Sequence, residues 1–174
     1  MVYLPWKNGY RFNDENARFL NSIAAKEGID EGLLGFTFEN EGLFNKMALG
    51  NDNESADQDK WDVGPFGLNY TYVTRELAAG YYKADGIDLT KALGATNLLV
   101  LHSLSDTSQF IDPLENGRLA ARRLAYQLRT SNNDYAKAAG RFRAYAGAAF
   151  TGRRDLWNLH GKQFQNFFKC FTER

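Results

Sequence analysis

The chain has 174 residues, of which 44% are hydrophobic and 14% aromatic, a size and composition that suit a globular fold with a sizeable core. Twenty-one basic and twenty-one acidic residues cancel, so the net charge points to neither nucleic acid nor an anionic membrane as a partner. A single cysteine, Cys170, excludes an internal disulfide, and no His/Cys set has zinc-ligand spacing. We therefore expect packing to supply the stability, with no metal and no cofactor.

The N-terminal residues lack a basic segment followed by an apolar run, which a signal peptide would need. No apolar run approaches the roughly 18 residues of a membrane span. We expect a monomeric chain with no membrane span and no export signal.

Two helices are predicted at the start of the chain. The first begins at Asn13 or Asp14 and runs to about Glu27, with Gly28 as its terminator. The second follows at once, with Asp30 as its N-cap. The inner stripe expected for the first helix consists of Ala17, Leu20, Ile23 and Ala24.

A polar stretch, Asn51–Lys60, follows this helix pair, and its composition favours turns or a short hairpin over a regular core element. Its alternating acidic and amide residues are similar to a calcium-binding loop. However, Ala56 and Asp62 stand where such a loop has Gly and Glu. We therefore expect an exposed lobe here and no calcium site.

The remaining apolar periodicity predicts further helices at about residues 74–83, 88–101, 113–129, 135–145 and 164–171. The helix at 113–129 has Asp112 as N-cap and Pro113 as first residue, and the helix at 135–145 has Asp134 as N-cap. Six or seven helices around one polar lobe predict a mainly α, single-domain fold over residues 1–174, with a small irregular or β-hairpin lobe.

Glu41 is expected on an apolar face of the second helix. At about 100° per residue, Leu34, Thr37 and Phe38 project to the same side, whereas Glu39 points about 200° away. A carboxyl group pressed against Leu and Phe loses hydration of its charged form, so its pKa rises and it can hold a proton near neutral pH. Glu41 is thus a candidate general acid, the alternative being a salt-bridged glutamate at a helix end.

A second carboxylate, Asp62, enters a segment rich in glycine and aromatic residues. Glycines allow a substrate to approach the backbone closely, and aromatic rings offer flat surfaces on which sugars stack. Glycoside hydrolysis commonly uses one protonated and one ionised carboxyl group, so Glu41 and Asp62 are a candidate pair. The alternative for Asp62 is a turn cap. The rings expected to meet a sugar are Trp61, Phe66 and Tyr70.

Separated stretches of the chain resemble motifs of the lysozyme-like superfamily, which includes lytic transglycosylases and animal and phage lysozymes. Residues 41–45, Glu-Gly-Leu-Phe-Asn, resemble its catalytic Glu followed by Ser, any residue, Phe and Asn. Residues 62–69, Asp-Val-Gly-Pro-Phe-Gly-Leu-Asn, resemble the motif that lines the sugar cleft. Residues 144–147, Ala-Tyr-Ala-Gly, are similar to a motif whose Tyr lies near the catalytic Glu. Residues 110–116 resemble an Asp-Pro-x-x-Asn segment that opens a helix in many lytic transglycosylases.

The resemblance implies a lysozyme-like fold in which Glu41 is the general acid and Gly67, Asn69 and Tyr145 lie at the substrate. The chain departs from the family pattern at three positions: Gly42 replaces Ser, Gly67 replaces Gln and Ala146 replaces Asn. These changes remove a side-chain donor near the acid and one substrate hydrogen bond, but they leave the acid itself in place.

The sequence therefore predicts an enzyme that cleaves the β-1,4 bond between N-acetylmuramic acid and N-acetylglucosamine in peptidoglycan, with glycan strands as its partner. Both a muramidase, which hydrolyses the bond, and a lytic transglycosylase, which forms a 1,6-anhydro sugar, fit the motifs. A chitinase or chitosanase and a catalytically inactive glycan-binding module are the alternatives. The sequence leaves open whether the protein reaches the wall as a secreted, periplasmic or phage-delivered enzyme.

Overall fold

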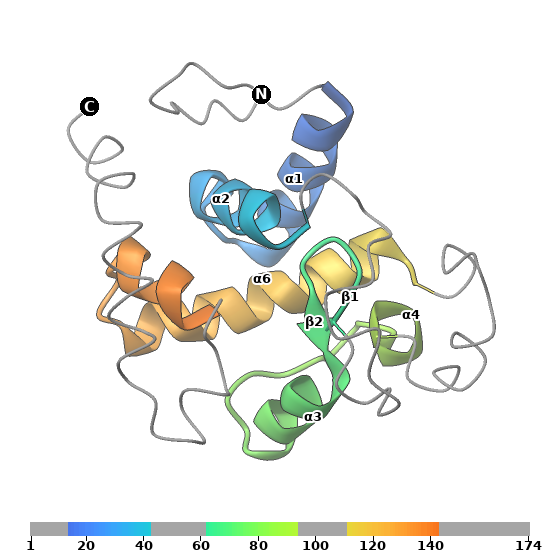
Figure 1. The fold of residues 1–174 in the computed structure, drawn as a ribbon, viewed down its shortest axis with the longest axis vertical. Coiled ribbons are helices and arrows are strands. Elements are labelled where there is room, and N and C mark those ends of the chain that lie inside the picture. The colour runs from blue at the N-terminus through green and yellow to red at the C-terminus, as the bar shows by residue number, and fades with distance from the viewer. Residues whose placement is uncertain (1–13, 43–61, 94–110, 143–174) are drawn as a thin grey trace. The chain divides into compact units, whose positions relative to one another are not determined.

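The computed structural model describes residues 14–42, 62–93 and 111–142, which are the coloured parts of Figure 1. This part is mainly helical, as expected. Its elements are α1 (Asp14–Glu27), α2 (Glu31–Gly42), β1 (Asp62–Val63), β2 (Leu68–Asn69), α3 (Tyr70–Ala78), α4 (Leu89–Leu93) and α6 (Pro113–Thr130), and residues 135–142 are also helical. The predictions for residues 51–60, 94–101 and 164–171 lie outside the described residues. The lysozyme-like fold stays a prediction.

Backbone contacts divide the chain into two compact units. Unit 1 combines Met1–Thr37 with Arg123–Arg174, and unit 2 is Phe38–Arg122. This division into units does not test the expected single domain, which stays a prediction. In the described ranges, every helix is too short or too polar to cross a membrane.

Helix α1 has the boundaries and the inner face that its sequence predicts. The four residues expected to face inward, Ala17, Leu20, Ile23 and Ala24, are all buried. Gly28 ends the helix with a φ of 66°, and its amide donates a hydrogen bond to the Ala24 carbonyl at 2.9 Å. Glycine adopts this left-handed conformation without steric cost, which makes it a common helix terminator.

Helix α2 begins at the predicted cap but is buried more widely than its pattern suggests. The Asp30 Oδ1 atom accepts a hydrogen bond from the Leu33 amide at 3.0 Å, which confirms the N-cap. Beyond this cap, every residue of 32–38 is buried, and seven consecutive residues cover all sides of a helix. A helix buried all round has no single inner face. The predicted difference in surroundings between Glu39 and Glu41 therefore does not follow from the helix face.

In unit 1, the second half of α6 is linked to the helical stretch 135–142. Asp134 caps this stretch, because its Oδ1 atom accepts a hydrogen bond from the Lys137 amide at 3.0 Å. The buried Arg123 donates a hydrogen bond to the Phe142 carbonyl at 3.1 Å. Its guanidinium carbon lies 4.6 Å from the centroid of the Phe142 ring, within cation–π range. Arg123 thus contacts both the backbone carbonyl and the ring of Phe142.

Tyr135 links the same helical stretch to the N-cap of α2. Burial, the negative charge of Asp30 and a hydrogen bond from the Tyr135 hydroxyl to the Asp30 carboxylate raise the pKa of Tyr135 above its ordinary value of 10.0. The folded state therefore favours the protonated tyrosine.

We expect Tyr135→Phe to lower the free energy of unfolding by about 0.5–1 kcal/mol at neutral pH, because it removes a partly exposed hydrogen bond. Since the pKa of the folded state lies above that of the unfolded state, this contribution is complete below about pH 10 and is lost as the pH rises through the folded-state pKa. In denaturant titrations from neutral pH to about pH 11, the free energies of unfolding of wild type and Tyr135→Phe should converge. Asp30→Asn, which keeps the capping oxygen but removes the charge, should weaken the pH dependence. A constant difference between wild type and Tyr135→Phe would contradict this account.

Candidate functional site

In unit 2, the segment that begins at Asp62 folds as an antiparallel hairpin. Asp62 pairs with Asn69, and Val63 pairs with Leu68. The turn closes through a hydrogen bond from the Gly67 amide to the Gly64 carbonyl at 3.2 Å. The sequence predicted a turn-forming segment here, and the structure confirms it.

Strand β2 leads directly into α3, as Figure 1 shows, and Asn69 marks the junction. Its Oδ1 atom accepts a hydrogen bond from the Tyr72 amide at 3.4 Å, so it is the N-cap of α3. The predicted boundaries, Thr74 to Lys83, are therefore wrong: this cap starts the helix earlier, and the chain leaves the helix before Gly80, whose φ is 75°. Asn69 is 6% exposed, and at least one of its side-chain atoms serves the helix.

Phe66, at the tip of the hairpin, is a core residue. Its ring centroid lies 5.6 Å from that of Phe38 in α2, with the two rings tilted by 54°. Both residues are 0% exposed. The expectation that Phe66 offers a flat surface to a sugar is corrected, because this ring is covered by protein. Its contact instead fixes the hairpin to the last part of α2, the helix that continues to Gly42.

Asn116, on the first half of α6, binds the hairpin through its side-chain amide. Its Oδ1 atom accepts a hydrogen bond from the Phe66 amide at 3.3 Å. Its Nδ2 atom donates to the Val63 carbonyl at 3.1 Å and to the Ala92 carbonyl at 2.8 Å. The residue is 0% exposed, so both of its N–H donors are used inside the protein. These bonds connect two of the stretches that resemble family motifs, residues 62–69 and 110–116.

Sequence reasoning assigned Asn116 to a motif but gave it no role. The available signal was an amide one turn after the Asp112-Pro113 helix start, followed by the small residue Gly117 and an alanine-rich helix. A polar side chain on the same helix face as Leu119 and Ala120 is buried only when it finds partners, so its position predicts a buried hydrogen-bond network.

Gly64 lies against this amide. Its φ of 75° is a conformation that L residues rarely adopt. A β-carbon at this position would also collide with the side chain of Asn116. The turn therefore needs glycine here for two separate reasons.

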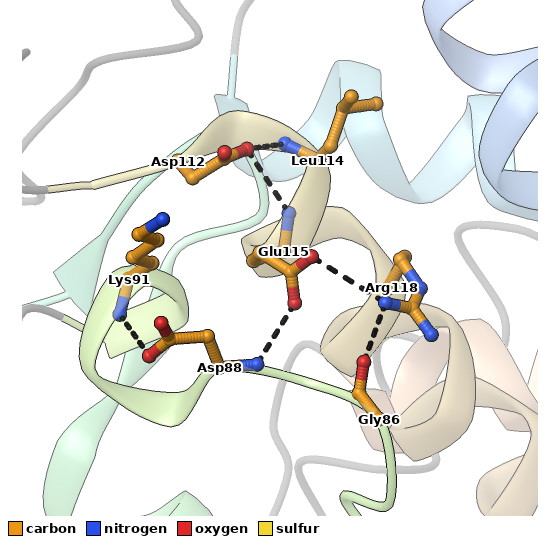
Figure 2. Close-up of polar contacts among 7 residues, drawn as sticks. All are labelled: Gly86, Asp88, Lys91, Asp112, Leu114, Glu115 and Arg118. Atoms are coloured by element: carbon orange, nitrogen blue, oxygen red, sulfur yellow. Dashed lines mark hydrogen bonds and ion pairs between the residues drawn. The ribbon is translucent and has the colours of Figure 1, made fainter.

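The first turns of α6 also hold the residues before and within α4 (Figure 2). The Asp88 amide donates a hydrogen bond to Glu115 at 2.9 Å, and Asp88 in turn accepts one from the Lys91 amide at 3.2 Å. Arg118 donates to the Gly86 carbonyl at 2.8 Å and pairs with Glu115 at 3.4 Å. A helix of five residues is too short to be stable alone. These contacts supply the support that α4 lacks.

The backbone assigns the two proposed carboxyl residues to regular elements: Glu41 belongs to the last turn of α2, and Asp62 is the first residue of β1. Their side chains lie outside the described part of the structure, and so do two of the predicted substrate residues, Trp61 and Tyr145. Gly67 and Tyr70 are partly exposed, at the end of the turn and the start of α3. Among the described residues, no three His, Cys, Asp or Glu side chains gather as a metal site.

Comparisons of the chain with models of protein families, with curated proteins and with solved structures find no match. Membership of the lysozyme-like superfamily therefore remains a prediction from the motif residues.

Gly67, which occupies the Gln position of the family pattern, has a φ of 55°. We expect Gly67→Gln to lower the free energy of unfolding by about 1 kcal/mol, because a side chain in this conformation meets its own backbone. The matched control is Gly80→Gln, at a φ of 75° with open space around the missing β-carbon, which should lose a similar amount. Denaturant midpoints measure both. If Gly67→Gln is as stable as wild type, the backbone conformation at this position imposes no strain on a side chain.

Proposed function

We propose that this chain is a glycosidase that cleaves the β-1,4 bond between N-acetylmuramic acid and N-acetylglucosamine in peptidoglycan, with Glu41 as the general acid. The observation that supports it best is the contact between Phe38 and Phe66, whose ring centroids are 5.6 Å apart. Phe38 precedes Glu41 by about one turn of α2, and Phe66 lies in the hairpin that begins at Asp62. The two segments proposed to carry the catalytic carboxyl groups are thus linked within unit 2.

The hydrogen bonds of Asn116 give separate support. They tie the hairpin to the Asp-Pro-x-x-Asn segment at distances of 3.1 and 3.3 Å. The resemblance was drawn from stretches that are far apart in the chain, and a chance likeness gives no reason for them to meet. Two of them, residues 62–69 and 110–116, are connected by hydrogen bonds, and Phe38, which precedes the third stretch in α2, packs on Phe66.

The part of α2 that precedes Glu41 is buried at every residue of 32–38. Apolar surroundings disfavour the charged form of a carboxyl group and raise its pKa. We expect Glu41 to use this effect near neutral pH.

In the proposed mechanism, the Glu41 carboxyl group gives its proton to the glycosidic oxygen as the bond from that oxygen to the sugar carbon breaks. Two routes then lead to product. In the first, Asp62 stabilises the cationic sugar or traps it covalently, and water completes hydrolysis. In the second, the Glu41 carboxylate takes a proton from the sugar's own 6-hydroxyl, whose oxygen closes a 1,6-anhydro ring without water.

We expect Glu41→Gln to lower cell-wall cleavage by at least about 100-fold, because it preserves the shape of the side chain but removes the transferable proton. The matched control is Glu39→Gln, the same substitution two positions earlier in α2, which should retain activity. Release of soluble fragments from purified walls measures both. Full activity in Glu41→Gln, or an equal loss in both variants, would show that Glu41 is not the acid.

We expect the 1,6-anhydro product, because the Asp112–Asn116 segment bound to the hairpin resembles the one found in lytic transglycosylases. Mass spectrometry should then show fragments lighter by one water than the hydrolysed ones. Under this route Asp62→Asn should retain activity within about tenfold of wild type, since Glu41 alone serves as acid and base. Fragments that contain the added water, together with a larger loss in Asp62→Asn, would favour the muramidase.

A catalytically inactive glycan-binding module is the second candidate, and Gly67 favours it. Glycine lacks the side chain with which the glutamine of the family pattern contacts substrate. Binding of the wild-type chain to purified walls without release of fragments would support this module. Cleavage of chitin oligomers in preference to walls would instead support a chitinase or chitosanase.

A further inference from the structure

We propose that Asn116 is a positioning residue of this site: it fixes the Gly64–Gly67 turn, and with it the hairpin that begins at Asp62, in the geometry that cleavage needs. This inference rests on the proposed glycosidase function. Asn116 is 0% exposed and acts through the backbone of the hairpin, at Phe66 and Val63.

The hairpin needs support from outside. Its strands have two residues each, and a two-stranded hairpin of any length is marginal in water. Phe66 receives that support twice. Its ring packs on Phe38, and its amide donates to Asn116. The ring contact links the hairpin to α2, whereas the amide bond links it to α6.

Asn116 is suited to this role because its own position is fixed. It lies in the first turns of α6, where the Asp112 Oδ1 atom accepts hydrogen bonds from the Leu114 amide at 2.8 Å and the Glu115 amide at 3.3 Å (Figure 2). The Asp112 amide in turn donates to the Lys91 carbonyl at 2.9 Å. A side chain on a capped helix, with its amide bonded on both sides, provides a rigid support for a turn.

Gly64 makes the fit between turn and support tight. The side chain of Asn116 occupies the space that a β-carbon at Gly64 would need. The turn therefore cannot gain even a methyl group at this position without moving away from Asn116. Such a shift is transmitted to Val63 and Asp62, the two residues of β1.

The first test compares Asn116→Ala with Asn16→Ala. Asn16 is also a buried asparagine, 4% exposed, but it lies on α1 in unit 1. We expect both variants to be less stable than wild type. At a temperature where both are folded, only Asn116→Ala should lower kcat on wall glycan, by about 100-fold with little change in KM, because a shifted hairpin holds the glycan out of line with Glu41, which slows the reaction more than it weakens binding.

The same pair is examined by amide hydrogen exchange, which does not depend on activity. Exchange of the Phe66 amide should be at least about tenfold faster in Asn116→Ala than in wild type, because its acceptor is gone. In Asn16→Ala the Phe66 amide should exchange as in wild type.

The second test keeps the asparagine and displaces the turn, and it serves if Asn116→Ala does not fold. Gly64→Ala is compared with Gly80→Ala: both positions have a φ of 75°, but only the former lacks room for the methyl group. Gly64→Ala alone should lower kcat, again by about 100-fold. In the double variant Gly64→Ala with Asn116→Ala the collision is absent, so its loss of stability should be smaller than the sum of the single losses.

Each result bears on one claim. If Asn116→Ala and Gly64→Ala keep the kcat of wild type, or if Phe66 exchange is unchanged in Asn116→Ala, the positioning role is overturned while the glycosidase stands. If the controls Asn16→Ala and Gly80→Ala lose kcat equally, the effect is general destabilisation and the role is again overturned. If wild type itself cleaves no glycan although its Phe66 amide is protected, the proposed function fails and the positioning role fails with it.

Discussion

The described part of unit 2 depends on one buried amide. Asn116 is 0% exposed and makes three hydrogen bonds, to the Phe66 amide and to the Val63 and Ala92 carbonyls. Each partner left unsatisfied in the interior costs about 1–3 kcal/mol. The hairpin and α4 meet α6 at this position, where one amide satisfies backbone groups of both.

Two kinds of contact hold the hairpin: the packing of buried rings and a directional hydrogen bond. The Phe38 and Phe66 rings exclude water but allow several tilted arrangements at similar energy, so they bring α2 and the turn together without fixing the turn's orientation. The bond from the Phe66 amide to Asn116, at 3.3 Å, is directional and supplies that orientation. A geometry useful for catalysis needs both contributions.

The sequence predicts those features that depend on residues a few positions apart. The caps at Asp30, Asp112 and Asp134 and the terminator Gly28 were all predicted, because each acts on backbone groups within about four residues. The predicted start of α3 is wrong although its cap is also local, because the resemblance assigns Asn69 to the sugar cleft, whereas its side chain caps the helix.

Features that depend on distant residues were not predictable in this way. The bonds of Asn116 join positions that are 24, 50 and 53 residues apart, and no periodicity in the sequence reports them. Phe66 shows the same limit: composition identifies an aromatic ring, but whether it meets a sugar or another ring depends on α2, far away in the chain. The sequence of α2 predicts one buried face, but residues 32–38 are buried on all sides. A helix pattern records apolar residues and does not report the distant neighbours that cover Gly32, Gly35 and Thr37.

The glycine at the Gln position of the family pattern has a structural explanation that bears on the choice between enzyme and inactive module. Gly64 and Gly67 both have positive φ, 75° and 55°, and they bracket Pro65 and Phe66 in a turn shaped to fit Asn116. A turn built in this way favours glycine at its last position whatever the protein does with a substrate. Gly67 is therefore accounted for by the backbone, and its presence alone does not imply that catalysis has been lost. An active enzyme with this turn must obtain the missing substrate hydrogen bond from another group, and the backbone of a glycine, which no side chain covers, allows a sugar to approach closely.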